Sequence, residues 1–240
     1  MNIDPVVSDF RRNFKSLGTP ERALQEKRYL KSPWKHYGVT VPKVHSLAKS
    51  FRKEHPDISE KDLYTLARRL WSSDWHEEKS LAIFLLHGYP RHLDYIHLPV
   101  YETMLKSAVG WCHVDEISAH LVGEVLLKDE RVYENLARWN KDENFWMRRA
   151  SLVSQLVIIR AGRDDLEFLF QMCTHLLHQK EFFIRKAIGW VLREASKKHP
   201  DEVYNFLLEH REEASGLTLR EGSKKLSKKQ REKIVGKKKM

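Results

Sequence analysis

The sequence predicts an all-α chain. Apolar residues recur at helical spacing along almost the whole length, and no alternating segment is long enough to predict a strand. Proline and glycine fall mostly between these segments, where helices begin and end. Residues 145–150 match residues 182–187 without gaps at a separation of 37 residues. Helix pairs repeated at this interval are typical of an α-solenoid of HEAT-like type, in which a concave face binds extended ligands.

The individual helices follow from the apolar spacing and from the residues that begin or cap helices. Pro20, Pro42 and Pro200 stand where helices can start, and Asn144 can act as a cap. The helices are expected near residues 6–17, 20–31, 42–54, 59–71, 75–88, 97–108, 113–128, 130–140, 144–161, 164–177, 181–198 and 200–210.

The positive charge is concentrated at the C-terminal end. The chain has a net charge of +10, and residues 219–240 contribute +8 of it through ten Lys or Arg and two Glu. The rest is nearly balanced, so an anion-binding surface on it must be a local patch. Residues 227–240 contain few apolar side chains, which predicts one domain over 1–226 followed by a Lys-rich mobile tail.

Composition and motifs exclude several classes of protein. The two cysteines, Cys112 and Cys173, cannot form a disulfide framework and lack metal-ligand spacing. The histidines are scattered, and neither a His-Glu-x-x-His motif nor a Walker loop occurs, so no metal and no cofactor are expected. No apolar run is long enough for a membrane span and no signal peptide is visible, so we expect a cytoplasmic protein.

Residues 181–194 form the most informative segment. Their spacing predicts one amphipathic helix, and Trp190 lies on roughly the opposite side from its apolar stripe, one turn from Lys186 and Arg193. The stripe consists of Ile184, Ile188, Val191, Leu192 and Ala195. Trp190 can pack against the next helix while the cations are solvated. Alternatively, these three residues form a surface for a polyanion, with a π face and phosphate-binding cations.

Two further residues have open alternatives. Asp115 follows Trp111 by four positions and borders an apolar stripe, which predicts a partly solvated carboxylate on the same side of one helix. It can cap the following turn, or it can serve chemistry beside an aromatic wall. Arg149 lies at the edge of its helix's apolar face, where it can pair with a neighbouring repeat or contact a phosphate.

Several motifs resemble one known family. They are Trp111-x-x-x-Asp115, Asn144-x-Trp146-x-x-Arg149-Ala150, Lys186-Ala187-Ile188-Gly189-Trp190-x-Leu192-Arg193-Glu194, Arg28-Tyr29-x-Lys31, Tyr37-Gly38-Val39-x-x-Pro42 and Leu219-Arg220-Glu221-x-x-Lys224-x-Leu226. Together they resemble the bacterial DNA alkylation repair glycosylases built from HEAT-like repeats, from about Tyr29 to Leu226. The chain departs from that pattern at Gly110, Thr40 and Lys225, which affects fine specificity more than the reaction.

The resemblance implies a monomeric enzyme that releases N3- and N7-alkylated purines from double-stranded DNA by N-glycosidic cleavage. These bases are already cationic, so they leave without protonation and one carboxylate suffices to stabilise the sugar cation. The implied catalytic residues are Asp115, Trp111, Trp190 and Arg149, and the implied DNA-binding residues are Tyr29, Thr40, Lys186, Arg193 and Lys225. The four catalytic side chains are expected to converge on one concave face, where the base stays stacked, and the protein would associate with the bacterial nucleoid.

A second class of function stays open, namely a non-catalytic HEAT-like DNA-binding or scaffold protein. Asp115 separates the two classes, because a carboxylate beside the DNA backbone is repulsive and is of no use to a pure binder.

Overall fold

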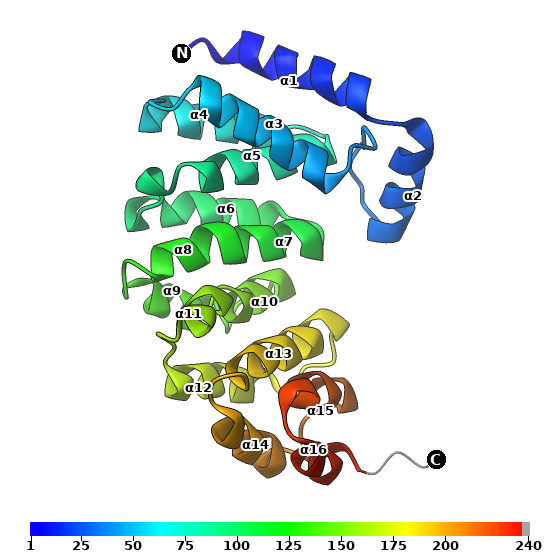
Figure 1. Ribbon diagram of the computed structural model, residues 1–240, viewed down its shortest axis with the longest axis vertical. Coiled ribbons are helices and arrows are strands. Elements are labelled where there is room, and N and C mark those ends of the chain that lie inside the picture. Colours follow the sequence, from blue (N-terminus) through cyan, green and yellow to red (C-terminus); the bar gives the residue numbers. More distant parts are fainter. Residues whose placement is uncertain (237–240) are drawn as a thin grey trace. The chain divides into compact units, whose positions relative to one another are not determined.

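A computed structural model describes residues 1–236 as a succession of helices (Figure 1). Apart from an isolated bridge between Lys35 and Trp75, these residues contain no β-structure. The predicted all-α, HEAT-like class is therefore confirmed. None of the described helices combines the length and apolarity that crossing a bilayer requires. The chain divides into two compact units, Met1–Leu121 and Val122–Met240; the prediction of one domain over 1–226 stays a prediction.

The first unit is built around α5, which contacts α3, α4 and α7. Every residue of α5 from His76 to Leu86 is buried, as expected of a helix with neighbours on several sides. The helices of this unit are α1 (Ile3–Leu17), α2 (Pro20–Leu30), α3 (Val41–Glu54), α4 (Glu60–Trp71), α5 (His76–Gly88), α6 (Leu98–Ser107) and α7 (Trp111–Ile117), with the short turns η1 (Pro90–His92) and η2 (Tyr95–His97).

Two buried carboxylates at the start of α5 hold the loop between α2 and α3. Glu77 accepts hydrogen bonds from the main-chain N–H groups of Tyr37, Gly38 and Val39 at 3.0, 2.7 and 3.1 Å. Glu78 receives the Arg11 guanidinium, with two nitrogen–oxygen distances of 3.0 Å, and the Tyr37 hydroxyl at 2.8 Å. Both carboxylates are thus fully partnered, which a buried charge requires.

The second unit is organised around α13, which packs against α10, α11, α12, α14 and α15. The predicted apolar stripe of α13 is confirmed, since all five of its residues lie in the core of this unit with no exposed surface. A π turn, η3 (Ser118–Val122), precedes this unit's helices in the chain. They are α8 (Gly123–Leu126), α9 (Val132–Trp139), α10 (Phe145–Val153), α11 (Leu156–Ala161), α12 (Leu166–Leu176), α13 (Phe182–Ala195), α14 (Pro200–Glu209), α15 (Gly216–Gly222) and α16 (Lys228–Val235), with the turn η4 (Ser223–Lys225).

Two expected helices are interrupted. The helix expected over 113–128 is divided by η3, and the one expected over 144–161 ends at Val153 and restarts at Leu156. At the second break the N–H of Gln155 donates to the carbonyl of Leu152, a tighter bond than the α-helical one.

Within the segment predicted to be a mobile tail, residues 228–235 form the helix α16; the mobility of the segment stays a prediction. Ser227 and Gln230 form a capping box at the start of this helix, and the Gln230 amide donates to Asp201 at 3.0 Å. Ile234 is only 1% exposed, so one apolar side chain anchors a helix that is otherwise rich in lysine. Residues 237–240 of the predicted tail lie outside the described residues.

Candidate catalytic and DNA-binding site

In the first unit, α7 carries Trp111 and Asp115, both half-buried. The helix is capped by Gly110, and Asp115 lies inside it, so the alternative role of Asp115 as a helix cap is wrong. Trp111 is the first residue of the helix and Asp115 stands one turn later, which puts them on the same side, as the spacing predicted. The neighbouring Glu116 is also half-buried.

Glu116, the neighbour of Asp115 on this helix, has an enclosed carboxyl group. The Glu116 Oε2 atom is shielded from solvent and has no hydrogen-bond partner among the described residues. Burial, followed by the negative charge of Asp115, raises the pKa of Glu116 to about 8. Glu116 is therefore mostly protonated at neutral pH. When burial raises the pKa of one of two neighbouring carboxyls in this way, the two groups can serve different roles.

His113, two residues before Asp115, is not a usable base. His113 is 1% exposed, its Nε2 lies 3.2 Å from the Ser80 hydroxyl, and its ring centroid lies 4.4 Å from that of His76. Burial, assisted by the charge of Lys79, lowers the pKa of His113 to about 3. Burial and the adjacent His113 lower the pKa of His76 to about 2. Both rings stay neutral and act as core residues.

Two groups of side chains in the first unit bring metal-ligand types together. Ligand atoms of His76, Cys112 and His113 lie within 4.8 Å of one another. The second group, also within 4.8 Å, consists of Glu26, His36 and Glu77. Sequence spacing missed both groups because their members come from different helices and loops. In the second, Glu77 already accepts three main-chain hydrogen bonds, which accounts for its burial.

The remaining predicted residues of the first unit lie near its N-terminus. Tyr29 is on α2 and is 75% exposed. Thr40 is half-buried and precedes α3 as its cap residue, with its carbonyl accepting from the N–H groups of Lys43 and Val44. An exposed tyrosine suits contact with a ligand, whereas Thr40 also has a local structural role.

In the second unit, Arg149 of α10 is only 3% exposed. Its Nη1 donates to the carbonyl of Phe183 on α13 at 2.5 Å, and its guanidinium lies 5.7 Å from the Phe183 ring centroid. These contacts support the structural alternative for Arg149, a link between neighbouring helices. They leave its contact with phosphate a prediction.

Trp190 lies on α13 between the two predicted DNA-binding cations. It is half-buried: one part of the side chain packs against the core of the second unit and another part stays exposed, so both alternatives for Trp190 remain open. Lys186 precedes it by one turn and Arg193 follows it by one turn, and each keeps part of its side chain exposed, at 39% and 22%. Lys225 is exposed in η4.

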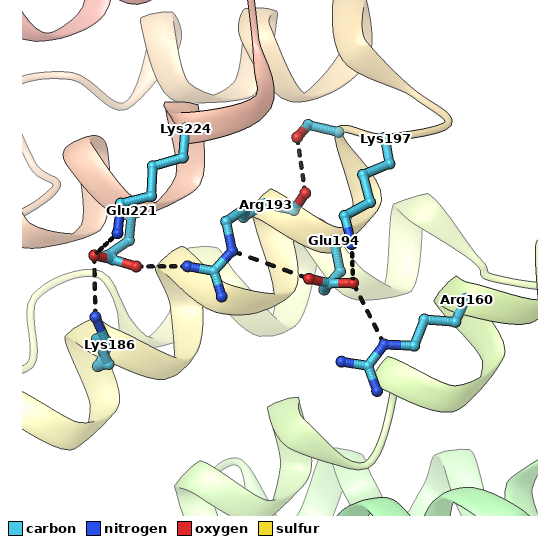
Figure 2. Close-up of polar contacts among 8 residues, drawn as sticks. Arg160, Lys186, Arg193, Glu194, Lys197, Glu221 and Lys224 are labelled. Carbon is cyan, nitrogen blue, oxygen red and sulfur yellow. Dashed lines mark hydrogen bonds and ion pairs between the residues drawn. The ribbon is translucent and has the colours of Figure 1, made fainter.

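Lys186 and Arg193 are not isolated cations, because both bind the carboxylate of Glu221 on α15. Lys186 Nζ lies 3.0 Å from Oε1, Arg193 Nη1 lies 2.6 Å from Oε2, and Lys224 Nζ lies 2.5 Å from Oε1 (Figure 2). Burial of Glu221 by itself would raise its pKa, but hydrogen bonds from Lys224 and Lys186 outweigh burial and hold the pKa at about 2.

A second carboxylate, Glu194, continues this network along α13. Its Oε2 lies 2.6 Å from Lys197 Nζ and 3.4 Å from Arg160 Nε, and its Oε1 lies 4.0 Å from Arg193 Nε (Figure 2). Burial would raise the pKa of Glu194, but hydrogen bonds from Lys197 and Arg160 keep it below its usual value. Both glutamates stand within the sequence motifs, but spacing along the chain assigned neither of them a role.

The structure thus brings together Trp111 with Asp115 in one unit, and Trp190 with Lys186 and Arg193 in the other. Convergence of the four predicted catalytic side chains stays a prediction, because they are divided between the two units.

A family model and two solved structures show which known proteins this chain resembles. A family model described as DNA alkylation repair enzyme matches residues 10–226. A solved structure described as a predicted DNA alkylation repair enzyme from Enterococcus faecalis matches with a TM-score of 0.80 and 26% identity, over 88% of this chain and 97% of that one. The crystal structure of AlkD2 from Streptococcus mutans matches with a TM-score of 0.60 and 18% identity, over 78% and 91% of the two chains, which supports the fold alone.

Among curated proteins, no sequence matches the chain significantly. The family model nevertheless spans nearly the whole chain, including α7, α10, α13 and α15. The chain belongs to the DNA alkylation repair enzyme family.

Proposed function

We propose that the protein is a monofunctional DNA glycosylase that hydrolyses the N-glycosidic bond of cationic N3- or N7-alkylated purines in duplex DNA. Membership of the DNA alkylation repair enzyme family supports the substrate class. The single observation that carries the reaction is the pair of neighbouring carboxyls on α7. Burial and the charge of Asp115 raise the pKa of Glu116 to about 8, so Glu116 is mostly protonated at neutral pH, and we assign the reaction to Asp115 beside Trp111.

One carboxylate is sufficient for this reaction. The alkylated purine carries a positive charge, so it departs with the bonding electron pair as a neutral base and needs no general acid. The sugar develops oxocarbenium character at C1′, which the Asp115 carboxylate stabilises electrostatically. A water oriented by Asp115 then adds to C1′ and loses a proton to solvent. No cofactor or metal takes part, and no lysine forms a Schiff base, so the DNA strand stays intact.

The other residues bind and orient the substrate. Trp111 and Trp190 present π faces to the developing cation at the sugar. Arg149, which donates one N–H to Phe183, also holds a phosphate when DNA binds, and Lys186 and Arg193 contact the backbone without reading bases. Further backbone contacts come from Tyr29, Thr40 and Lys225. The modified base stays stacked in the duplex, and the protein acts as a monomer.

The test is single-turnover release of free base from duplex DNA that carries either 7-methylguanine or uracil. Wild type should release the cationic base and leave the neutral uracil in place. Asp115→Asn should bind the duplex as tightly as wild type or slightly more tightly. It should release 7-methylguanine about 10²–10³-fold more slowly, because the transition state no longer meets a negative charge at the sugar.

The matched control is Glu116→Gln, which changes the neighbouring carboxyl. Because Glu116 is mostly protonated at neutral pH, this variant should release base at nearly the wild-type rate at pH 7. Rapid uracil release, or an Asp115→Asn variant as fast as wild type, would exclude Asp115 as the catalytic carboxylate. Duplex binding without release of any base would favour the non-catalytic DNA-binding function.

A further inference from the structure

Glu221 is a buried carboxylate surrounded by cations. Its side chain is 8% exposed and receives Lys186, Arg193 and Lys224 at 2.5 to 3.0 Å (Figure 2). Two of these cations come from α13 and the third from η4, which directly follows α15, the helix of Glu221. One cation would neutralise the charge of this carboxylate, so Glu221 and its three cations together carry a net positive charge.

The packing of α15 on α13 places this carboxylate. Gly189 is the residue of α13 at the contact, and a Cβ built on it would lie 2.5 Å from the Cβ of Glu221 and 3.2 Å from the carbonyl oxygen of Thr218. Only glycine permits so close an approach of the two helices. The Glu221 carboxylate can therefore reach side chains one turn before and one turn after Trp190.

The two α13 cations are long, flexible side chains, and Glu221 is the carboxylate that both of them contact at 3.0 Å or less. Lys186 and Arg193 are seven residues apart, which corresponds to about 10 Å along a helix axis. Lys and Arg each lose considerable rotamer freedom when they are fixed, and a ligand that meets them unrestrained must order them on binding. Glu221 orders both before any ligand arrives, while their side chains stay 39% and 22% exposed.

We propose that Glu221 is a positioning residue that holds Lys186 and Arg193 on either side of Trp190, ready to meet the phosphates of one DNA strand. The partner in this inference rests on the function proposed above. The role of Glu221 is separate from it, because it concerns binding rather than base release. If charge alone mattered, Glu221 would reduce the contribution of Lys186 and Arg193 to DNA binding, because a carboxylate among the cations weakens the attraction of each one for phosphate.

A double-mutant cycle on duplex binding distinguishes positioning by Glu221 from the effect of charge alone. The change Lys186→Gln is made in wild type and in Glu221→Gln, and Kd for an undamaged duplex is measured at fixed salt. If Glu221 orders Lys186, removal of Lys186 should weaken binding about threefold to tenfold more in wild type than in the Glu221→Gln background. An equal or larger effect in the Glu221→Gln background would overturn the proposal.

The matched control is Glu194→Gln, which removes an equally buried carboxylate from the same network without touching Lys186. Lys186→Gln should weaken binding as much in this background as in wild type. A reduced effect there would show that the coupling is not specific to Glu221 and would overturn the proposal. Glu221→Asp is the second test variant, which keeps the charge and shortens the reach. It should lower the contribution of Lys186, whereas unchanged coupling would contradict positioning.

The cycle is read from binding, so it decides the role of Glu221 even where no base is released. Failure of the proposed glycosylase activity is thereby distinguished from failure of this inference. Wild-type protein that does not bind duplex DNA would overturn both.

Discussion

The buried histidines and Glu116 of the first unit make opposing contributions to stability as the pH falls from 7 to 5. His76 and His113 have folded pKa values of about 2 and 3, far below the value near 6.5 of an unfolded chain. Below about pH 6.5 the unfolded state binds protons that the folded state does not, so the free energy of unfolding falls. Each histidine should remove about 2 kcal/mol between pH 7 and pH 5, at about 1.4 kcal/mol per pKa unit.

Glu116 acts in the other direction, because its folded pKa of about 8 lies above the unfolded value near 4.3. Its stabilising contribution is full below the unfolded pKa and is lost as the pH rises through 8. On acidification from pH 7 to pH 5 the folded state therefore gains about 3 kcal/mol from Glu116. Together the three groups leave a net loss of only about 1 kcal/mol in wild type.

The separate contributions become visible in variants. Glu116→Gln removes the compensation and should lose about 4 kcal/mol between pH 7 and pH 5. Adding His113→Phe, which keeps an aromatic ring beside His76, should reduce that loss to about 2 kcal/mol. The change with pH is the quantity that matters, so any uniform loss of stability in a variant does not affect the comparison.

The assay is hydrogen exchange of peptides from α5, measured at both pH values and corrected for the chemical exchange rate. Exchange of α13 peptides gives an internal comparison, and His175→Gln changes an exposed histidine and should leave the pH dependence unaltered. If Glu116→Gln protected α5 equally at pH 7 and pH 5, the assignment of neutral buried histidines would be refuted.

Two further predictions concern α13 and α16. Gly189→Ala should lower the free energy of unfolding of the second unit by about 1–3 kcal/mol in urea denaturation, because the added Cβ meets Glu221 at 2.5 Å. Gly88→Ala is the control and should show little change, because the nearest atom to its added Cβ is 3.8 Å away. Replacing Lys228 and Lys229 of α16 with Gln should make the log–log salt dependence of duplex binding shallower by about 0.9 for each phosphate that these lysines neutralise. Saturated single-turnover base release should stay unchanged, and an unaltered salt slope would show that these lysines do not touch DNA.

Local periodicity was sufficient for most of the fold. The apolar stripe of α13 depends only on the geometry of a single helix, so the sequence predicted its buried residues. The same reasoning placed Trp111 and Asp115 on one side of one helix. It did not predict the helix α16, where composition suggested a tail, because a capping box and one buried isoleucine stabilise a helix that average hydrophobicity does not reveal.

The sequence by itself determined the helical class, the repeat and the residue types of the candidate site, because these depend on spacing along the chain. Only the tertiary structure decided which cations share a carboxylate and which carboxyl group is protonated. Glu221 reaches Lys186 and Arg193 because Gly189 lets two helices approach closely, and Glu116 is protonated because its neighbours enclose it. Burial and cross-helix contacts arise only when distant segments pack together, and no periodicity along a single helix encodes them.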